Sequence, residues 1–306
     1  MIDKFNFYDI FGYFLPGASL LLLLWLPFGL VRKSWPASDL GSAVIGVVVA
    51  YVAGHFLQMI CTKVIPSTVA LGQHKRPRYP SDVVIDKDNS NLSIDFKKKL
   101  EARVKEKFDL DIGVEQPESK ELDQVRRDAF FLARHILIRA KQVSYAEQFE
   151  GLYTLTRNLA GALAIACVNY IGWAVSIVRR TWLDCVVIVI VTVSLLAAAT
   201  FAAQLLREQK DLQESFGKNA SMWLERLSAL ALMLTALGVG YWTGRRYEVT
   251  PVKMGELAVC GIGALLGALR CYSAYKSFTN SFAITIWRDF FASTDAPAPP
   301  SEALEV

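Results

Sequence analysis

Residues 12–31 read GYFLPGASLLLLLWLPFGLV, an unbroken run that contains no charged side chain. At a rise of about 1.5 Å per residue, a helix of this length spans the roughly 30 Å hydrocarbon core of a bilayer. Backbone polar groups in lipid must find their hydrogen-bond partners within the protein, and a helix provides them locally. The run therefore predicts a membrane-spanning helix, and similar runs predict five more. The six predicted spans are residues 12–31, 42–62, 159–178, 183–205, 226–243 and 254–272.

The composition of the whole chain agrees with insertion into a membrane. Of the 306 residues, 53% are hydrophobic and only 20% are charged. A soluble domain has about a quarter of its residues charged, and a soluble core of this size would lack the polar surface to cover it. Residues 1–9 lack the basic region of a signal peptide, so we expect the first apolar run to remain in the mature protein.

Short connections group the six spans into three hairpins. Each connection between paired spans has only about five to ten residues, so the spans that it joins are expected to be antiparallel neighbours. The predicted fold class is therefore all-α: a polytopic membrane helical bundle of about six transmembrane helices in three hairpins, with a small cytoplasmic helical segment. The tips of the hairpins carry paired cations with aromatic neighbours, which suit the level of the lipid headgroups. These headgroup candidates are Arg32, Lys33, Trp35, Arg179, Arg180, Trp182, Arg245 and Arg246.

The predicted spans divide the chain into six segments of different character. Roughly twice as many Lys and Arg residues flank the spans on the side of the termini as on the side of the tips. Both termini and the large polar segment are therefore predicted to be cytoplasmic. The segments are a first transmembrane hairpin (1–62), a cytoplasmic helical segment (63–158), a second hairpin (159–205), a cytoplasmic connector (206–225), a third hairpin (226–272), and a cytoplasmic helical extension with a disordered tail (273–306).

Two helices are predicted within the polar segment, and a third continues beyond the last span. Ser93 is suited to cap a helix that ends near Phe108. A second helix is expected from Lys120 onward, because apolar residues recur there at helical spacing. The last span continues in an apolar and aromatic series to Phe290, in which Trp287 either anchors the helix at the membrane surface or faces the polar segment.

A few polar side chains fall inside the predicted spans, where burial of such groups is costly unless they are paired or used. His55 and Gln58 lie nearly on one face of the second span, Asn169 lies in the third, and Glu256 lies near the start of the sixth. Gln58 and Asn169 are typical of polar contacts between helices. Glu256 is placed for an interfacial ion pair with Lys253 or a tip arginine. His55 is either a proton-sensitive or ligand-binding group or a histidine satisfied by one neighbour.

No catalytic or cofactor motif accompanies these residues. The five cysteines lie in or at the ends of apolar runs without paired spacing, and the three histidines lack a metal-ligand spacing. The chain has no nucleophile elbow, phosphate-binding loop or HExxH motif. We therefore expect no cofactor, no metal site, no enzymatic activity and no direct binding of nucleic acid.

Small residues in the last two predicted spans indicate close helix association. Gly240 and Gly244 form one GxxxG pattern, and Gly263 and Gly267 form another. Two backbones approach closely where side chains are absent, which holds helices together in lipid. The sequence leaves three alternatives open: the partner is a helix of this chain, the same helix of a second copy, or there is no partner. A homo-oligomer is the favoured expectation.

Two short segments carry a resemblance to a known group of proteins. Residues 7–17, FYDIFGYFLPG, and residues 149–159, FEGLYTLTRNL, resemble segments of uncharacterised bacterial multi-pass inner-membrane proteins, some of which are encoded beside antiviral defence genes. The resemblance covers about a tenth of the chain and brings no catalytic residues with it. It implies a bacterial inner-membrane location and a role in defence.

The leading functional hypothesis is a non-enzymatic, self-associating inner-membrane protein. Its cytoplasmic segment would receive a signal or a protein partner, while its spans form a pore, disturb the bilayer or anchor a defence complex. The alternatives are a transporter or channel for a small solute and, third, an intramembrane enzyme centred on His55. A transporter would require broken helices or polar side chains that converge within the membrane.

Overall fold

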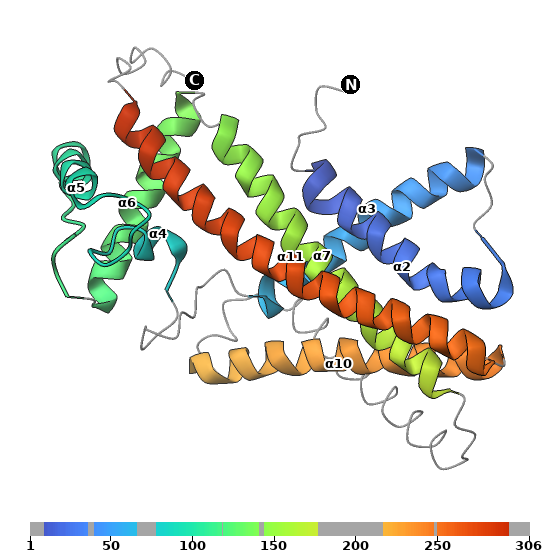
Figure 1. Cartoon of the computed structure of the whole chain (residues 1–306). Helices are drawn as coiled ribbons and strands as arrows, with labels where there is room; N and C mark the ends of the chain where they lie inside the picture. Colours follow the sequence, from blue (N-terminus) through green and yellow to red (C-terminus); the bar gives the residue numbers. More distant parts are fainter. Residues whose placement is uncertain are drawn as a thin grey trace. The chain divides into compact units, whose positions relative to one another are not determined.

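The computed structural model describes residues 9–35, 40–65, 78–117, 119–140, 144–176, 217–247 and 250–293, and in these residues all regular secondary structure is helical (Figure 1). The chain divides into two compact units. An apolar unit comprises the described residues within Met1–Pro66 and Thr154–Tyr275, and a polar unit comprises those within Ser67–Tyr153 and Lys276–Val306. The division falls inside helices α7 (Ser144–Val175) and α11 (Pro251–Ala292), so each contributes residues to both units.

Four helical stretches of the described chain are long and apolar enough to cross a membrane. The all-helical, multi-pass character that the sequence predicts is thereby confirmed, whereas the arrangement of six spans in three hairpins is not. The predicted fourth span, 183–205, lies outside the described residues. The predicted fifth span, 226–243, is helical within α10 (Gly217–Arg246) but is not among the four. Those four stretches are Ile10–Arg32, Leu40–Val64, Tyr145–Val175 and Val252–Ala292.

The first hairpin is formed by a short π-helix, η2 (Ile10–Phe14), with α2 (Leu15–Arg32) and α3 (Leu40–Val64). Glycines bring its helices into backbone contact. A Cβ on Gly17 would overlap the backbone of α3 at Ala50, and a Cβ on Gly54 would overlap the carbonyl of Tyr13. Beyond this crossing the two helices diverge toward the loop that joins them (Figure 1).

Helix α7 is the centre of the apolar unit. In its most apolar window 61% of the residues are buried, compared with 22% in each of the other three candidate spans. One side packs on α2, α3 and α10 and another on α2 and α11. Neighbouring helices therefore cover α7 on several sides and bury most of its apolar window. The buried residues of these contacts are Leu57, Cys61, Ala162, Ile165, Ala166, Cys167, Tyr170 and Ala264.

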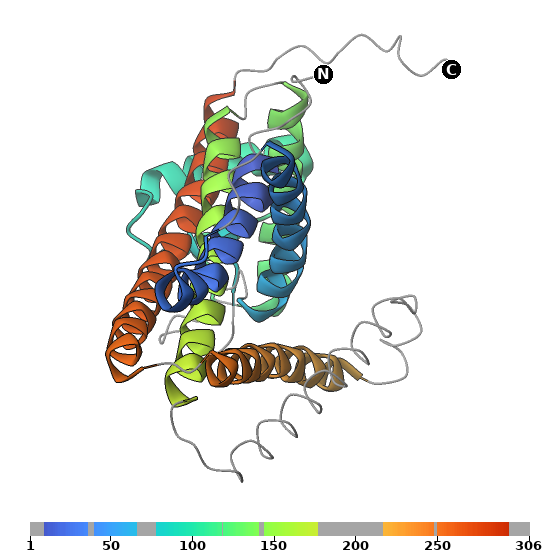
Figure 2. The ribbon, with the colours of Figure 1, turned by 90° about the vertical axis from the view of Figure 1, so that its right-hand side faces the viewer.

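The predicted antiparallel packing of residues 226–243 on 254–272 is not confirmed. In both views α10 diverges from α11 beyond the turn that joins them (Figures 1 and 2). Its close partner is α7, since a Cβ on Gly172 would overlap the carbonyl of Leu237 and a Cβ on Gly240 would overlap the carbonyl of Asn169. Small residues at this crossing let the two backbones touch, and this determines the neighbour of α10.

The polar unit contains α4 (Pro80–Val83), α5 (Ile94–Phe108), α6 (Lys120–Arg139), the start of α7 and the end of α11. The predicted helices of the polar segment are confirmed, including the cap of α5, in which the Ser93 hydroxyl accepts a hydrogen bond from the Phe96 N–H at 3.3 Å. Ser119 caps α6 in the same way through Leu122. The core of the unit is apolar and rich in aromatic side chains. It includes Val84, Ile85, Leu100, Val104, Ile112, Ala129, Phe130, Ala133, Leu137, Phe282, Ile286, Trp287 and Phe290.

The end of α11 faces the other helices of the polar unit, which decides between the two roles predicted for Trp287. The indole is fully buried, lies 5.5 Å from the Phe130 ring and donates to the Ser81 carbonyl at 3.3 Å. A buried indole N–H needs an acceptor, and Ser81 provides it. The extension of the last span is therefore a structural part of the polar unit.

Candidate functional site

A group of hydrogen-bonded polar side chains, here called the polar node, joins η2, α3 and α7 in the apolar unit. The amide of Asn158, which is fully buried, donates to the Gln58 side-chain oxygen at 2.6 Å and to the Gly12 carbonyl at 2.8 Å. The carbonyl belongs to the π-helix, a geometry that occurs often at functional sites. One amide group therefore holds three helical segments together through both of its N–H donors.

Two further polar residues of α7 come shortly before Asn158, and both are buried. Thr154 precedes Asn158 by one helical turn, whereas Arg157 is its neighbour in the chain and lies about 100° away around the helix. Within the described structure, the Thr154 hydroxyl, the Arg157 Nε and the Asn158 Oδ1 are buried without a hydrogen-bond partner. Such groups are rare in folded proteins because each carries a desolvation cost. The polar node is therefore the part of the apolar unit best suited to meet a polar solute or a lipid headgroup.

The node lies toward the ends of spans rather than at their centres. Gly12 is near the start of the stretch Ile10–Arg32, and Gln58 is near the end of Leu40–Val64. In an antiparallel hairpin these two ends lie together. The node is thus at the end of the first hairpin that is opposite its tip.

His55 lies one turn before Gln58, but its described neighbours are aromatic rings. The imidazole stacks on Tyr13 with ring centroids 3.9 Å apart, and Tyr51 approaches it edge-on at 4.6 Å. The side chain is exposed rather than enclosed within the apolar unit. No group of three or more His, Cys, Asp or Glu that could hold a metal ion occurs in the part of the chain that the structure describes.

The other two intramembrane polar candidates contact single partners. Asn169 donates to the Ala236 carbonyl at 3.0 Å across the α7–α10 crossing. Glu256 accepts two hydrogen bonds from Lys253, at 2.9 and 2.7 Å, one turn earlier on α11. The structure therefore brings Gln58 together with Asn158, which the sequence did not single out, and leaves Asn169 and Glu256 in separate places.

The tip residues that the structure describes lie at helix ends. The Arg32 guanidinium stacks on the Tyr247 ring at 4.9 Å, and the exposed Lys33 ends α2 in a left-handed conformation with φ of 53°. The Trp35 ring covers Gly29, where a Cβ would collide with it. Arg245 and Arg246 are in the last turn of α10, where positive charges interact favourably with the helix dipole. Arg179, Arg180 and Trp182 lie outside the described residues.

The four candidate glycines have different surroundings. Gly240 and Gly244 both face α7, because a Cβ on either would overlap atoms of Asn169 or Ser176. A Cβ on Gly267 would lie 3.2 Å from Leu163, also on α7. Gly263, in contrast, has no atom within 4 Å of its ideal Cβ position. The first GxxxG pattern is therefore used inside the chain, whereas Gly263 is exposed on α11.

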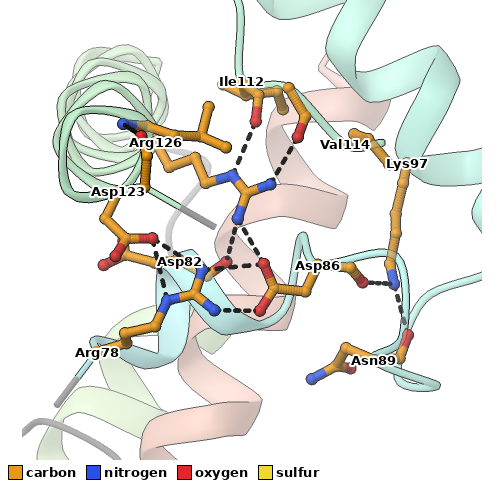
Figure 3. Close-up of polar contacts among 12 residues, drawn as sticks. Arg78, Asp82, Asp86, Asn89, Lys97, Ile112, Val114, Asp123 and Arg126 are labelled. Atoms are coloured by element: carbon orange, nitrogen blue, oxygen red, sulfur yellow. Dashed lines mark hydrogen bonds and ion pairs between the residues drawn. The ribbon is translucent and has the colours of Figure 1, made fainter. Parts of the chain in front are cut away.

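The polar unit contains a buried group of ionised side chains, here called the charge cluster (Figure 3). Arg78 bridges two carboxylates: it donates to Asp86 at 2.5 and 2.9 Å and to Asp123 at 3.0 Å through Nε and 2.8 Å through a terminal nitrogen. Arg126 donates to the same Asp86 carboxylate at 2.5 Å. Buried charges are tolerated only when paired in this way.

Arg126 also ties the loop after α5 to α6. Its Nε donates to the Ile112 carbonyl and a terminal nitrogen to the Gly113 carbonyl, both at 2.8 Å (Figure 3). Gly113 has φ of +51°, a conformation that favours glycine. One guanidinium therefore fixes the loop against α6 and Asp86.

Lys97 and Asp82 complete the charge cluster. The Lys97 ammonium donates to the carbonyls of Asp86 and Asn89, and its burial lowers its pKa (Figure 3). Burial raises the pKa of Asp82, while its hydrogen bond from Ser81 and the charge of Arg127 act in the opposite direction. Because donors and acceptors in the cluster are largely matched, its most direct role is to fix the fold of the polar unit.

One feature of the sequence is a signal of this cluster. Arg126 falls on the face of α6 that carries Leu122, Ala129 and Phe130, so a charge interrupts an apolar stripe. A long charged residue at such a position predicts a buried partner. The sequence gives no indication of its identity, since Asp86 is 40 residues away.

Replacement of Asn158 with leucine is expected to loosen the polar node. Gln58 and the Gly12 carbonyl would lose their donor, and hydrogen bonds between helices in membranes contribute on average about 0.6 kcal/mol each. We expect a loss of about 1 kcal/mol, measured as a lower melting temperature of the detergent-solubilised protein. Asn158→Leu, Gln58→Leu and the double variant form a cycle that tests the contact itself. Fully additive effects would show that the two side chains are not coupled.

Comparisons of the chain with models of protein families, with curated proteins and with solved structures found no match.

Proposed function

We propose that this chain is a non-enzymatic, self-associating protein of the bacterial inner membrane, with both termini in the cytoplasm. In this proposal the polar unit receives a cytoplasmic protein partner or signal, and the apolar helices act on the membrane. The specific version that we favour is an antiviral defence effector that forms a pore or disrupts the bilayer, or a membrane anchor of a defence complex. The resemblance of residues 7–17 and 149–159 supports the bacterial and defence parts of the proposal.

The observation that carries self-association is the exposed face of α11. Val259, Ile262 and Leu266 are 70%, 60% and 61% exposed, and Gly263 lies among them with open space beyond its Cα. Exposed apolar side chains alone are normal for a helix in lipid. The glycine adds a place where the backbone of a second helix can approach closely. Since Gly240 and Gly244 are already used against α7, Gly263 is the glycine of the predicted set suited to contact a second copy.

A leucine at position 263 is therefore expected to weaken self-association without disturbing the fold. An added Cβ at this position has no atom within 4 Å in the described structure, but the leucine would separate α11 from the α11 of a second copy. We expect at least a tenfold weaker association, measured by fluorescence transfer between labelled copies in nanodiscs and liposomes. Gly46→Leu is the matched control, because it adds the same side chain at another exposed glycine without neighbours. A wild-type protein that remains monomeric at all protein-to-lipid ratios would contradict the proposal.

The effector role is tested in cells. We expect induced wild-type protein to lower membrane potential and arrest growth in the presence of phage, and the Gly263→Leu variant to do so less. The fluorescence of a potential-sensitive dye reports the first effect and culture density the second. Membrane potential and growth that are unaffected by induction, both with and without phage, would remove the support for an effector.

The polar node favours a second candidate, a transporter or channel for a small solute. Its π-helix and its converging Gln58 and Asn158 side chains are features expected of solute sites in membranes. The test is uptake of a small solute into liposomes that contain the protein. Uptake that is saturable, and that Asn158→Leu or His55→Ala abolishes, would favour a transporter over an effector. The position of the node near span ends, rather than at the midplane, is the reason that it ranks second.

A further inference from the structure

The diverging helices α2 and α3 enclose an apolar groove within the apolar unit. It has a volume of about 790 Å³, within the range of about 300–1,000 Å³ that is usual for sites of small ligands. Its walls are aliphatic and aromatic, with Ser42 as the one hydroxyl among the lining residues that the structure describes. The groove ends where Gly17 brings α2 against the backbone of Ala50.

The depth of the groove matches one leaflet of a bilayer. From Phe28, near the hairpin tip, to Ala18, near the closed end, α2 advances ten residues, which at about 1.5 Å each is roughly 15 Å. Half of a hydrocarbon core about 30 Å thick has the same extent. A single acyl chain that enters from the tip side would therefore reach the closed end.

Two cations follow at the end of α2, beyond the tip-side end of the groove. Leu21, Trp25 and Phe28 line it at spacings of four and three residues, and Arg32 follows four residues later on the same face of α2. Lys33 comes next, and both cations are exposed. The guanidinium carbon of Arg32 lies 4.9 Å from the centroid of the Tyr247 ring, a cation–π contact that places the arginine beside the ring without neutralising its charge.

No carboxylate in the described part of the chain forms an ion pair with Arg32 or Lys33. Trp25 and Trp35 lie near the end of α2 that carries these cations. The Trp25 indole donates to the Ser34 carbonyl at 2.9 Å, and the Trp35 ring covers Gly29. Tryptophan at this level is typical of the boundary between hydrocarbon and headgroups. An apolar groove one leaflet deep thus ends at a cationic, tryptophan-lined rim.

We propose that this groove binds one anionic phospholipid of the tip-side leaflet. One acyl chain lies between α2 and α3, and the phosphate is held by Arg32 and Lys33. An arginine edge can bind phosphate with two parallel hydrogen bonds, and each cation near an anionic headgroup contributes about 1 kcal/mol. The proposal rests on insertion of the chain into a bilayer, which is part of the proposed function, but it is independent of self-association.

The test is native mass spectrometry of the full chain released from nanodiscs that contain equal amounts of phosphatidylglycerol and phosphatidylcholine. We expect the wild-type protein to retain one phosphatidylglycerol in preference to phosphatidylcholine. Arg32→Gln combined with Lys33→Gln should reduce this preference by roughly thirtyfold, the factor that corresponds to about 1 kcal/mol from each cation. Gly46 lines the groove, and an added Cβ there has no atom within 4 Å. Gly46→Leu should therefore fill part of the groove and reduce retention of both lipids.

Two control variants separate this site from general contact with lipid. Gly263→Leu adds the same side chain on α11, and Arg270→Gln removes an exposed cation from the same helix. Both should retain phosphatidylglycerol as the wild-type protein does. Equal retention of the two lipids by the wild-type protein, or unchanged retention in Gly46→Leu, would overturn the proposal. Extraction of the protein from membranes by carbonate would instead contradict the proposed function itself, so the two failures are distinguishable.

Discussion

Replacement of Arg126 with methionine is expected to unfold the polar unit while the apolar unit remains helical. Arg126 is only 1% exposed. Its guanidinium donates hydrogen bonds to the Asp86 carboxylate and to the carbonyls of Ile112 and Gly113. Methionine fills similar space but supplies no donor, so the partly buried Asp86 carboxylate loses one of its two arginine partners, and the carbonyls of Ile112 and Gly113 lose their donor. Removal of one partner from a buried ion pair typically costs about 3–5 kcal/mol.

Amide hydrogen exchange of the full chain in nanodiscs measures this effect. The core amides of α5 at Leu100 and Val104 should exchange more than about a hundredfold faster, as expected for a loss of about 3 kcal/mol or more. Amides of α7 between residues 160 and 170 report on the apolar unit and should change little. Lys98→Met is the matched control, because Lys98 pairs with Glu115 where both side chains are more than half exposed. Pairs of that kind contribute little to stability.

A double variant tests whether the charged side chains of the cluster stabilise one another. In the double variant Arg126→Met with Asp86→Leu, the carboxylate is removed together with its partner, so the variant should recover part of the lost protection. An Arg126→Met variant that exchanges like Lys98→Met would show that the buried contacts of Arg126 contribute no net stability.

Replacement of Gly240 with leucine is expected to have the largest effect in the apolar unit. A Cβ at this position overlaps the backbone carbonyl of Asn169, and a backbone in the middle of α7 cannot move aside as a side chain can. Helices α10 and α7 must separate, which also breaks the hydrogen bond from Asn169 to the Ala236 carbonyl. We expect a loss of about 3 kcal/mol or more, since overpacking alone costs about 1–3 kcal/mol.

The loss should appear as a lower melting temperature in detergent and as an aggregated fraction in gel filtration. At roughly 2–4 °C for each kcal/mol, a decrease of about 6–12 °C is expected. Gly263→Leu makes the same substitution where no atom lies within 4 Å, so it should melt within about 2 °C of the wild-type protein. Equal melting temperatures for the two variants would contradict the close crossing of α10 and α7.

Local patterns in the sequence were sufficient for most of the helices. The uncharged run at 12–31 predicted the span that begins with η2 and continues as α2, because length and apolarity alone fit a helix to a bilayer. Ser93 and the apolar spacing after Lys120 predicted α5 and α6, because caps and periodicity act within one or two turns. The continuation of α11 to Ala292 followed from its apolar and aromatic series.

The partners of these helices were not predictable in the same way. Gly240 and Gly263 are both part of a GxxxG pattern, yet only Gly240 touches another helix of the described chain. Asn158 was overlooked because it lies just before the predicted third span, and its partners Gln58 and Gly12 are 100 and 146 residues away. Arg126 is a similar case. The sequence of α6 shows its charge among apolar residues but does not identify its partner.

Helix formation and hydropathy depend on neighbouring residues, so the amino-acid sequence is enough to establish helical runs that are long and apolar enough to cross a membrane. The faces that meet are known from the fold alone: α10 packs on α7, Asn158 contacts Gln58, and Arg78 and Arg126 surround Asp86. Close backbone crossings and buried ion pairs depend on distances between residues far apart in the chain, and no local pattern encodes those distances.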